Sequence, residues 1–205
     1  MVPRCAVRVA VLAAAFLGTG AVNSWARTDH YTSHESAVHH SYASHRKCTN
    51  AGLMPTAKDL KLIRAATLCL INRERRLHGE RPLRPNARLR RAAQAHSTSM
   101  AFDDYFQHVG PRGQTPLARM RAVGYVSRRE LSFEVGENIA WGTLWLATPR
   151  AIVATWMASP GHRANILDPR YRETGIGVSP HPLSSRAHGQ PGAIYTQDFG
   201  VVKPS

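Results

Sequence analysis

The stretch SPGHRANILDPRYRETGIGV, residues 159–178, marks the point where the chain changes from helical to strand-like patterning. Ser159 followed by Pro160 is a typical helix start, because the hydroxyl can cap the first turn and proline loses no hydrogen bond at the first helical position. After Pro169 the residues become β-branched or alternate with glycine, which predicts a strand over residues 173–180. Helices are therefore expected before this stretch and strands within and after it.

The same hydroxyl–proline signature occurs at residues 115–116 and 148–149, so two more short helices are expected to begin there. The first should end near Gly124, since glycine readily takes the left-handed conformation that closes a helix. The second places three large apolar side chains on one face, and we expect that face to be buried. These side chains are Ile152, Val153 and Trp156.

Two longer helices are expected upstream, one over residues 56–79 with Thr56 as its N-cap and one that begins after the N-cap Asn86. At 100° per residue each gathers an apolar face that should point into the core. The first face consists of Leu62, Ile63, Ala66, Leu70 and Leu77, and the second of Leu89, Ala92, Ala93, His96 and Met100.

The last part of the chain predicts a second strand, AIYTQDFGVV, residues 193–202. A connector rich in Gly, Pro and Ser, residues 180–192, separates it from the strand at residues 173–180, which favours an antiparallel pair. Helices first and strands last indicate a single α+β domain in which helices cover an antiparallel sheet.

The first 26 residues resemble a signal peptide, with Arg4 and Arg8 before an apolar run and a small-residue cleavage site after Ala26. The apolar run spans residues 9–22, fewer than the roughly 20 residues that cross a bilayer as a helix. We therefore expect cleavage and no transmembrane segment afterwards, with a retained anchor as the alternative. The polar, His-rich residues 27–47 should form a disordered leader, and residues 48–205 the folded domain.

Removal of residues 1–26 takes away two arginines and no acid, so the formal net charge falls from +14 to +12. A basic exported protein can associate with anionic envelope polymers, although a well-solvated arginine-rich surface has the same composition. Nucleic acid is not expected as a partner, because no zinc-finger or aromatic RNA-binding motif accompanies the arginines. We expect a monomer that is secreted or held at the cell envelope.

Two cysteines, Cys48 and Cys69, remain after the predicted cleavage. An isolated pair in an oxidising compartment most simply forms one disulfide, which would fasten the end of the leader to the first helix. A reactive thiol at Cys69 is the weaker alternative, because no second cysteine in a Cys-x-x-Cys spacing lies beside it.

Three segments carry ionisable groups beside glycine: FQHVGPRGQTP with His108, FEVGENIAWG with Glu134 and Glu137, and SPGHRANIL with His162. Two histidines and a carboxylate can hold Zn²⁺ and activate its water, or they can perform acid–base chemistry without metal. The spacing along the chain does not decide between a zinc site and metal-free acid–base chemistry, because the three groups meet only if the fold brings three separate segments together.

Six segments in order resemble the bacterial, secreted branch of the CAP superfamily, also called the SCP or YkwD-like domain. They are LCLINRERRLHGERPL, FQHVGPRGQTP, VGENIAWG, WMASPGHRANIL, YRETGIGV and YTQDFG. The resemblance runs from about Cys48 to Val202 and implies an α-β-α sandwich, with a central antiparallel sheet between helical layers. It also implies a further strand between Gly124 and Gly136.

Eukaryotic members of that family line a cavity with two His and two Glu residues. The resemblance places His108 at the first histidine and Glu137 at the glutamate of the GENI motif. Ser159 and Ile194 stand where the second glutamate and the second histidine would be. His162 is the bacterial branch's own histidine, so the resemblance implies a His108, Glu137 and His162 triad that lines the cavity.

Two functions follow for this triad as alternatives. In the first, the domain is a binding module whose His/Glu cleft holds a small apolar, peptide or glycan ligand. In the second, it is a metal-assisted hydrolase in which His108 and His162 bind zinc and Glu137 acts on the water, with His96 as a conceivable third ligand. Neighbouring polar residues have structural interpretations: a salt bridge for Glu134, and hydrogen bonds to local backbone for Asn138 and Asn165.

Overall fold

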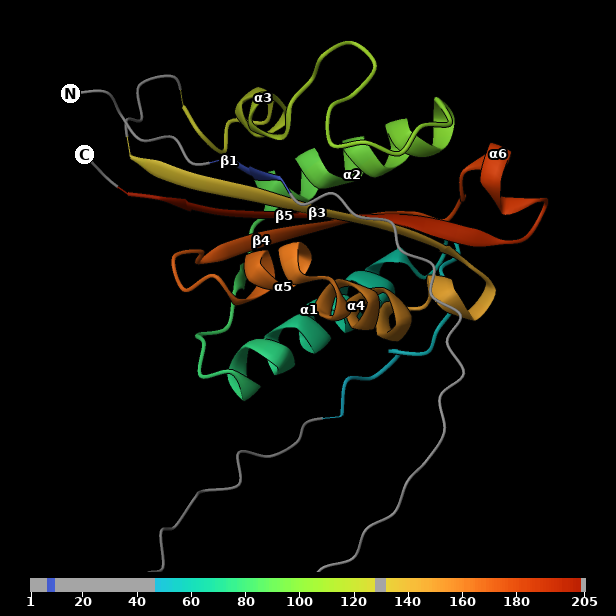
Figure 1. Ribbon diagram of the computed structural model, residues 1–205, viewed down its shortest axis with the longest axis horizontal. Coiled ribbons are helices and arrows are strands. Elements are labelled where there is room, and N and C mark those ends of the chain that lie inside the picture. Colours follow the sequence, from blue (N-terminus) through green and yellow to red (C-terminus); the bar gives the residue numbers. More distant parts are fainter. Residues whose placement is uncertain (1–6, 10–46, 128–131, 204–205) are drawn as a thin grey trace, which may run out of the picture. The chain divides into compact units, whose positions relative to one another are not determined.

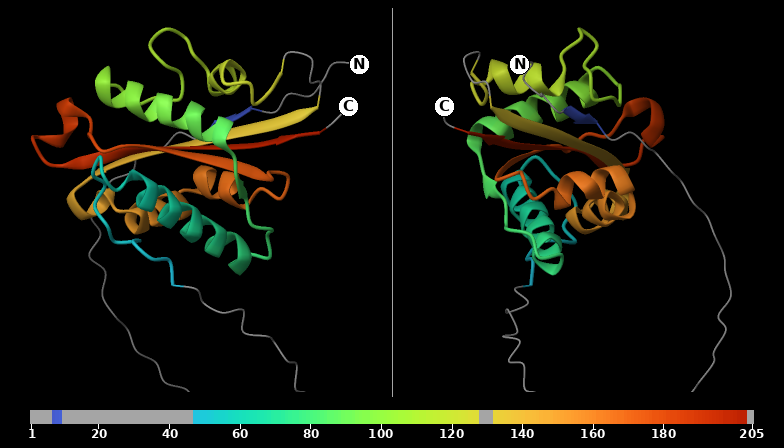
Figure 2. Two further views of the ribbon diagram at one scale, coloured as in Figure 1. Left: turned by 180° about the vertical axis from the view of Figure 1, so that it is seen from behind. Right: turned by 60° about the vertical axis from the view of Figure 1, so that its left-hand side comes forward.

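The computed structural model describes residues 7–9, 47–127 and 132–203. The predicted leader, apart from Lys47, and most of the predicted signal peptide lie outside the described residues. Helices α2 and α3 cover one face of a central sheet, and α1, α4 and α5 cover the other (Figure 1; Figure 2). This layering confirms the α+β class and the α-β-α sandwich.

The sheet has the strand order β1-β3-β5-β4-β2. Its members are β1 (Val7–Val9), β2 (Arg84–Pro85), β3 (Phe133–Thr143), β4 (Glu173–Ser179) and β5 (Gly192–Val202). The three central strands pair antiparallel, as expected for β4 and β5, whereas the short outer strands β1 and β2 pair parallel with β3 and β4. Strand β1 comes from the predicted signal segment, and β2 was not predicted.

Strand β3 lies later in the chain than the strand expected between Gly124 and Gly136, because it runs on through the GENIAWG motif to Thr143. Glu137 therefore lies within a strand. Glu137 pairs with Asp198 in the middle of the β3–β5 ladder. Its side chain consequently points into a helix-covered face of the sheet.

The helices are α1 (Leu60–Leu77), α2 (Ala87–Phe102), α3 (Pro116–Ala122), α4 (Pro149–Ala158), α5 (Pro160–Leu167) and the short α6 (Ser184–Ala187), with a 3₁₀ turn η1 (Leu144–Ala147). Asn86, Thr115 and Thr148 accept backbone N–H bonds as side-chain caps, as predicted. Ser159 precedes α5 but its side chain makes no capping hydrogen bond, so only its position was predicted correctly.

Helix α1 begins four residues later than predicted. The Thr56 hydroxyl donates to the Asp59 carboxylate at 2.6 Å instead of capping a helix. Leu62 and Leu77 of the predicted apolar stripe are 44% and 63% exposed, because they lie at the edges of the stripe. The stripe's centre is buried as predicted, and so is the whole predicted face of α2, including His96.

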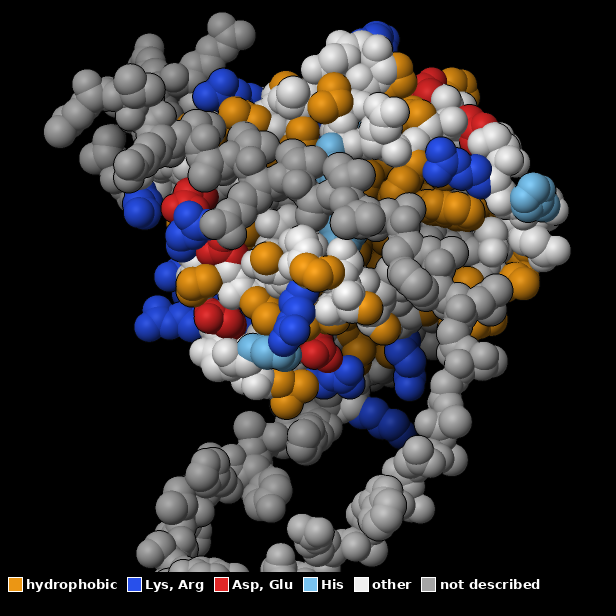
Figure 3. Space-filling model, in the orientation of Figure 1, with side chains coloured by type: hydrophobic (Ala, Val, Ile, Leu, Met, Phe, Trp, Pro, Cys, Tyr) orange, Lys and Arg blue, Asp and Glu red, His pale blue; other side chains and the backbone are white. Residues whose placement is uncertain are grey.

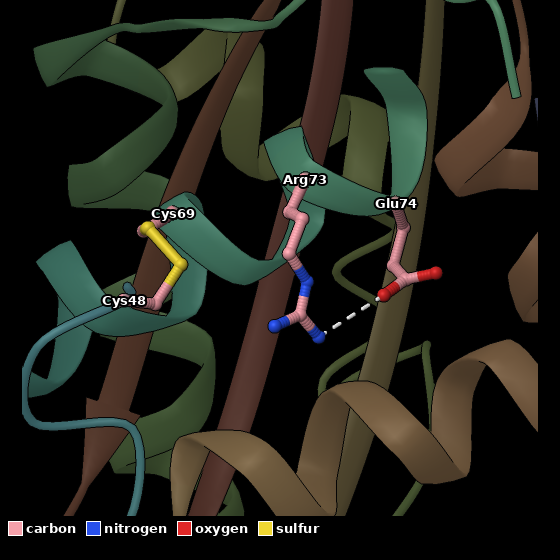
Figure 4. The surroundings of a disulfide bond; sticks show 4 residues. All are labelled: Cys48, Cys69, Arg73 and Glu74. Atoms are coloured by element: carbon pink, nitrogen blue, oxygen red, sulfur yellow. Dashed lines mark hydrogen bonds and ion pairs between the residues drawn. A yellow bond between two sulfur atoms is a disulfide. The ribbon is translucent and has the colours of Figure 1, made fainter. Parts of the chain in front are cut away.

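Cys48 and Cys69 form the predicted disulfide, with their Cα atoms 5.7 Å apart. Figure 4 shows how it joins the segment before α1 to the middle of that helix. One turn further along, Arg73 and Glu74 form an exposed ion pair at 3.3 Å. The bridge therefore anchors the first described residues of the domain.

Arg75 is a fully buried cation on α1 that was not predicted to have a structural role. Its guanidinium donates to the Ile166 and Asp168 carbonyls at 2.6 and 3.0 Å, and to the Arg81 carbonyl at 2.7 Å. Carbonyls at a helix C-terminus lack hydrogen-bond donors within the helix, and the buried Arg75 guanidinium supplies these donors. Arg75 thereby ties α1 to the C-terminal end of α5.

The aromatic residues divide between the core and the surface. Trp156 is fully buried and its indole N–H donates to the Ile139 carbonyl at 3.1 Å. Phe102 and Trp145, in contrast, are 88% and 70% exposed. Phe102 is the last residue of α2, and Trp145 lies in the four-residue turn η1.

Helix α2 lies directly on β4 because Gly175 has no side chain. A Cβ at Gly175 would come within 2.0 Å of the backbone nitrogen of Arg90.

Within the described part of the chain, no helix combines the length and apolar character needed to span a membrane. Lys and Arg side chains lie around the margin of the face shown in Figure 3, as the basic composition suggests.

Candidate functional site

Glu137 is the centre of a buried charged cluster on the β3 face that α2 and α3 cover. Its side chain is 1% exposed, and both of its oxygens accept hydrogen bonds from charged or titratable groups. His108 Nδ1 donates to Oε1 at 2.8 Å, and Arg119 Nη2 donates to Oε2 at 2.6 Å. The structure thus brings two of the three predicted residues, His108 and Glu137, into direct contact.

Arg119 organises the loop that carries His108. It lies on α3, and besides Glu137 it donates to the Gln114 carbonyl at 2.6 Å and the His108 carbonyl at 3.0 Å. One guanidinium therefore fixes both ends of the segment from His108 to Gln114. Sequence reasoning missed Arg119, because nothing in the pattern of a short helix says which of its two arginines turns inward.

The pKa of Glu137 is held below its ordinary value. Burial alone would raise it, but the hydrogen bond from His108 and the charges of His96, Arg119 and His108 outweigh the burial. Glu137 is therefore a carboxylate in the folded protein. A carboxylate that accepts from Nδ1–H fixes the orientation of the His108 ring.

Asp198 is a second buried carboxyl group, opposite Glu137 on β5. Its pKa is raised, first by burial and next by the charge of Glu137, because two adjacent carboxylates repel. Its Oδ1 has no hydrogen-bond partner among the described residues. The YTQDFG motif contained the signal, namely an acidic residue within a strand that is otherwise apolar or uncharged.

His162 lies in the first turn of α5 and is only 6% exposed. Neither ring nitrogen has a hydrogen-bond partner among the described residues. Its pKa is lowered to about 4, first by burial and then by the charge of His108. The imidazole is therefore neutral at physiological pH, and the charge of His108 acts on it.

Two asparagines hold the His162 turn against β3. Asn138 Nδ2 donates to the His162 carbonyl at 3.1 Å. Asn165 Nδ2 donates to the Glu137 carbonyl at 3.3 Å and to Asn138 Oδ1 at 2.9 Å. Both amides donate to backbone carbonyls as predicted, but these carbonyls are 24 and 28 residues away and are not local. The two asparagines thereby dock α5 on the strand that carries Glu137.

The remaining polar residues near the motif have structural partners. Glu134 forms an ion pair with Arg170 at 2.8 Å, as predicted. His96 Nε2 donates to the Gln107 carbonyl at 3.0 Å, and burial lowers the pKa of His96 to about 4. His96 Nε2 lies 3.8 Å from Glu137 Oε1, but it is already hydrogen-bonded to the Gln107 carbonyl.

A catalytic zinc ion needs three protein ligands and an open position. Within residues 7–9, 47–127 and 132–203, no group of three or more His, Cys, Asp or Glu side chains has the arrangement of a metal site. His96 is engaged with backbone, and both Glu137 oxygens are engaged with His108 and Arg119. The donor set therefore does not fit a catalytic zinc ion.

Comparison with known proteins gives a consistent set of relatives. The model of the Cysteine-rich secretory protein family, CAP, matches residues 68–199. The uncharacterized protein YkwD of Bacillus subtilis (strain 168) is 35% identical over 131 residues, which are 63% of this chain and 44% of YkwD. The chain thus spans less than half the length of this curated relative.

Two solved structures share the fold. An extracellular protein containing a SCP domain from Bacillus anthracis str. Ames has a TM-score of 0.55 and 25% identity, over 73% of this chain and 44% of that chain. An outer surface protein from Borrelia burgdorferi has a TM-score of 0.55 and 19% identity, over 73% of this chain and 96% of that chain. The matched segment contains His108, Glu137 and His162, and the chain belongs to the Cysteine-rich secretory protein (CAP) family.

Proposed function

We propose that the cluster of His108, Glu137 and His162 is a ligand-binding site, and that the chain is an exported binding module at the cell envelope or outside the cell. The observation that carries this proposal is the His162 ring, which is buried with both nitrogens unpartnered among the described residues. A buried donor or acceptor without a hydrogen-bond partner costs about 1–3 kcal/mol of free energy. A ligand that supplies a partner to the His162 ring would remove this cost.

The protonation of His162 defines the ligand's chemistry. A neutral imidazole offers one N–H donor and one acceptor. It therefore suits a ligand that carries both hydroxyl or amide donors and carbonyl acceptors, as peptides and glycans do. Of the three ligand classes expected from the sequence, these two fit the site better than a purely apolar molecule.

Glu137 contributes as a fixed support for His108. The Arg119 and His108 hydrogen bonds occupy one oxygen each, which pre-organises the site before a ligand arrives. The same contacts weigh against the metal-assisted hydrolase, because a carboxylate held on both oxygens is poorly placed to take a proton from a water molecule. The binding module is therefore the function that the geometry supports best.

Export is part of the proposal. The N-terminal pattern of residues 1–26 supports it, and so do two relatives whose names describe an extracellular and an outer surface protein. Expression of the full chain followed by N-terminal sequencing of the exported protein tests it, with Arg27 as the expected first residue. Recovery of the chain only with residues 1–26 attached would contradict cleavage.

Calorimetric titration of the exported protein with a soluble disaccharide–peptide fragment of peptidoglycan tests the site. This probe carries both a glycan and a peptide. His162→Ala should weaken its binding at least tenfold, whereas His181→Ala, at an exposed histidine in the β4–β5 connector, should leave it unchanged. Equal binding by both variants would place the ligand elsewhere.

A zinc titration separates the two alternatives. The binding module predicts at most weak, substoichiometric zinc, because only two of the three usual ligands are available. Tight one-to-one zinc that is lost in His108→Ala would overturn the proposal in favour of the metal-assisted hydrolase.

A further inference from the structure

A groove of about 630 Å³ lies between the N-terminal half of α1, the start of α2 and strand β4, and none of its lining residues belongs to the His108 cluster. Its lining includes three cations, Lys61, Arg64 and Arg90, together with the apolar side chains of Ala65, Leu68 and Ile176. Gly175, one of the lining residues, lets the first turns of α2 lie against β4. The groove is therefore a concave feature of the fold that is basic and partly apolar.

None of the three cations of the groove takes part in an ion pair within the described residues. Arg64 makes one long hydrogen bond, from Nη1 to Gln94 Oε1 at 3.4 Å. Burial and the positive charge of Arg90 lower the pKa of Arg64, so the two guanidinium groups repel each other. An anion placed between them would relieve this repulsion.

The polar groups beside the groove are hydrogen-bonded to one another. Glu173, on β4 beside Thr174, accepts hydrogen bonds from Asn86 Nδ2 and the Tyr125 hydroxyl, both at 2.9 Å. The Asn86 side chain also caps α2 by accepting from two backbone amides. The first turn of α2 is thus already satisfied, and attraction for an anion must come from the cationic side chains.

We propose that this groove binds a phosphate ester carried on a small polyol or sugar, as in one repeat of an anionic envelope polymer. Guanidinium groups match phosphate oxygens through paired hydrogen bonds. The apolar floor packs against the carbon skeleton of the polyol. A concave groove fits a segment of a polymer better than the flat surface of a bilayer.

The test uses bis(glycerol) phosphate, a soluble phosphodiester, in an NMR titration of the exported protein. Arg64→Gln combined with Arg90→Gln should weaken binding at least tenfold. The matched control is Arg76→Gln combined with Arg88→Gln, which removes the same charge from the same two helices at exposed positions outside the groove. This control should retain the wild-type affinity within twofold, and both variants should keep the wild-type Tm.

A second variant tests shape without changing charge. Ala65→Trp fills the groove from an exposed helical position, so it should abolish binding while leaving the fold intact. Equal losses in the two double variants would show diffuse attraction to surface charge and would overturn the proposal. Failure of the wild type to bind the phosphodiester, or binding only to phosphatidylglycerol vesicles, would overturn it as well.

Discussion

Replacement of Glu137 by Gln should destabilise the domain by about 3 kcal/mol, because it removes one partner of a buried charged pair. The Glu137 side chain is 1% exposed, and it accepts from Arg119 at 2.6 Å and from His108 at 2.8 Å. Removing it leaves the Arg119 guanidinium, itself only 10% exposed, without a carboxylate. Asp198 can ionise in its place, so we expect the lower end of the usual 3–5 kcal/mol.

Urea denaturation at pH 7, followed by tryptophan fluorescence, measures this loss. For a domain of this size about 3 kcal/mol corresponds to a fall in Tm of about 9 °C. Glu134→Gln is the matched control in the same strand, because its partner Arg170 is 41% exposed and a surface ion pair contributes at most about 1 kcal/mol. A difference of less than 1 kcal/mol between the two variants would refute the reasoning.

The effect of Glu137→Gln also has a defined pH dependence. The folded-state pKa of Glu137 is lowered, so its stabilisation is present above its unfolded pKa of about 4.3 and is lost as the pH falls through the folded value. The stability difference between wild type and Glu137→Gln should therefore be largest near neutral pH and shrink in acid. A difference that grows in acid would contradict a carboxylate at this position.

Three further predictions concern stability. Cys48→Ser combined with Cys69→Ser opens a link with a sequence separation of 21, so it should cost about 3 kcal/mol and lower Tm by about 10 °C in calorimetry; an unchanged Tm would show that the bridge is unimportant. The pKa of His162 is lowered to about 4, so the unfolded state binds a proton at this residue more readily than the folded state does. The contribution of His162 to the free energy of unfolding should therefore fall by up to about 1.4 kcal/mol per pH unit as the pH drops from 6.5 towards 4. His162→Asn should flatten that slope in a series of urea titrations, and an unchanged slope would show that the ring is not buried in neutral form. Gly175→Ala places a Cβ 2.0 Å from the α2 backbone and should cost about 3 kcal/mol in urea denaturation, whereas Gly52→Ala meets nothing within 4 Å and should change stability by less than about 0.5 kcal/mol; equal effects would contradict the close approach of α2 and β4.

The order and class of most elements could be predicted because they depend on local signals. Asn86, Thr115 and Thr148 cap helices where the sequence places a cap, and β4 and β5 carry recognisable strand composition. Strand β3 was misplaced because the fold covers both of its faces with helices. A strand buried on both faces shows no alternation of polar and apolar residues, so its limits are hard to read.

The site was predicted in part. His108 and Glu137 stand out because each is an ionisable residue beside glycine, and their contact is confirmed at 2.8 Å. Arg119 and Asp198 escaped notice because their roles depend on strand register and on a loop closing over β3, which are long-range properties. The burial of His162 escaped notice for the same reason, since the docking of α5 on β3 depends on two asparagines from separate elements.

The hydrogen bonds of Arg75 couple the position of α1 to the position of His162 in the proposed ligand site. Arg75 holds the C-terminal end of α5, and His162 lies in the first turn of that same eight-residue helix. A helix of this length is about 12 Å long and moves nearly as a rigid rod. A small shift of the Arg75 guanidinium would therefore move the His162 imidazole at the other end of α5. Substitutions in the core near Arg75 can thus alter ligand affinity without contacting the ligand.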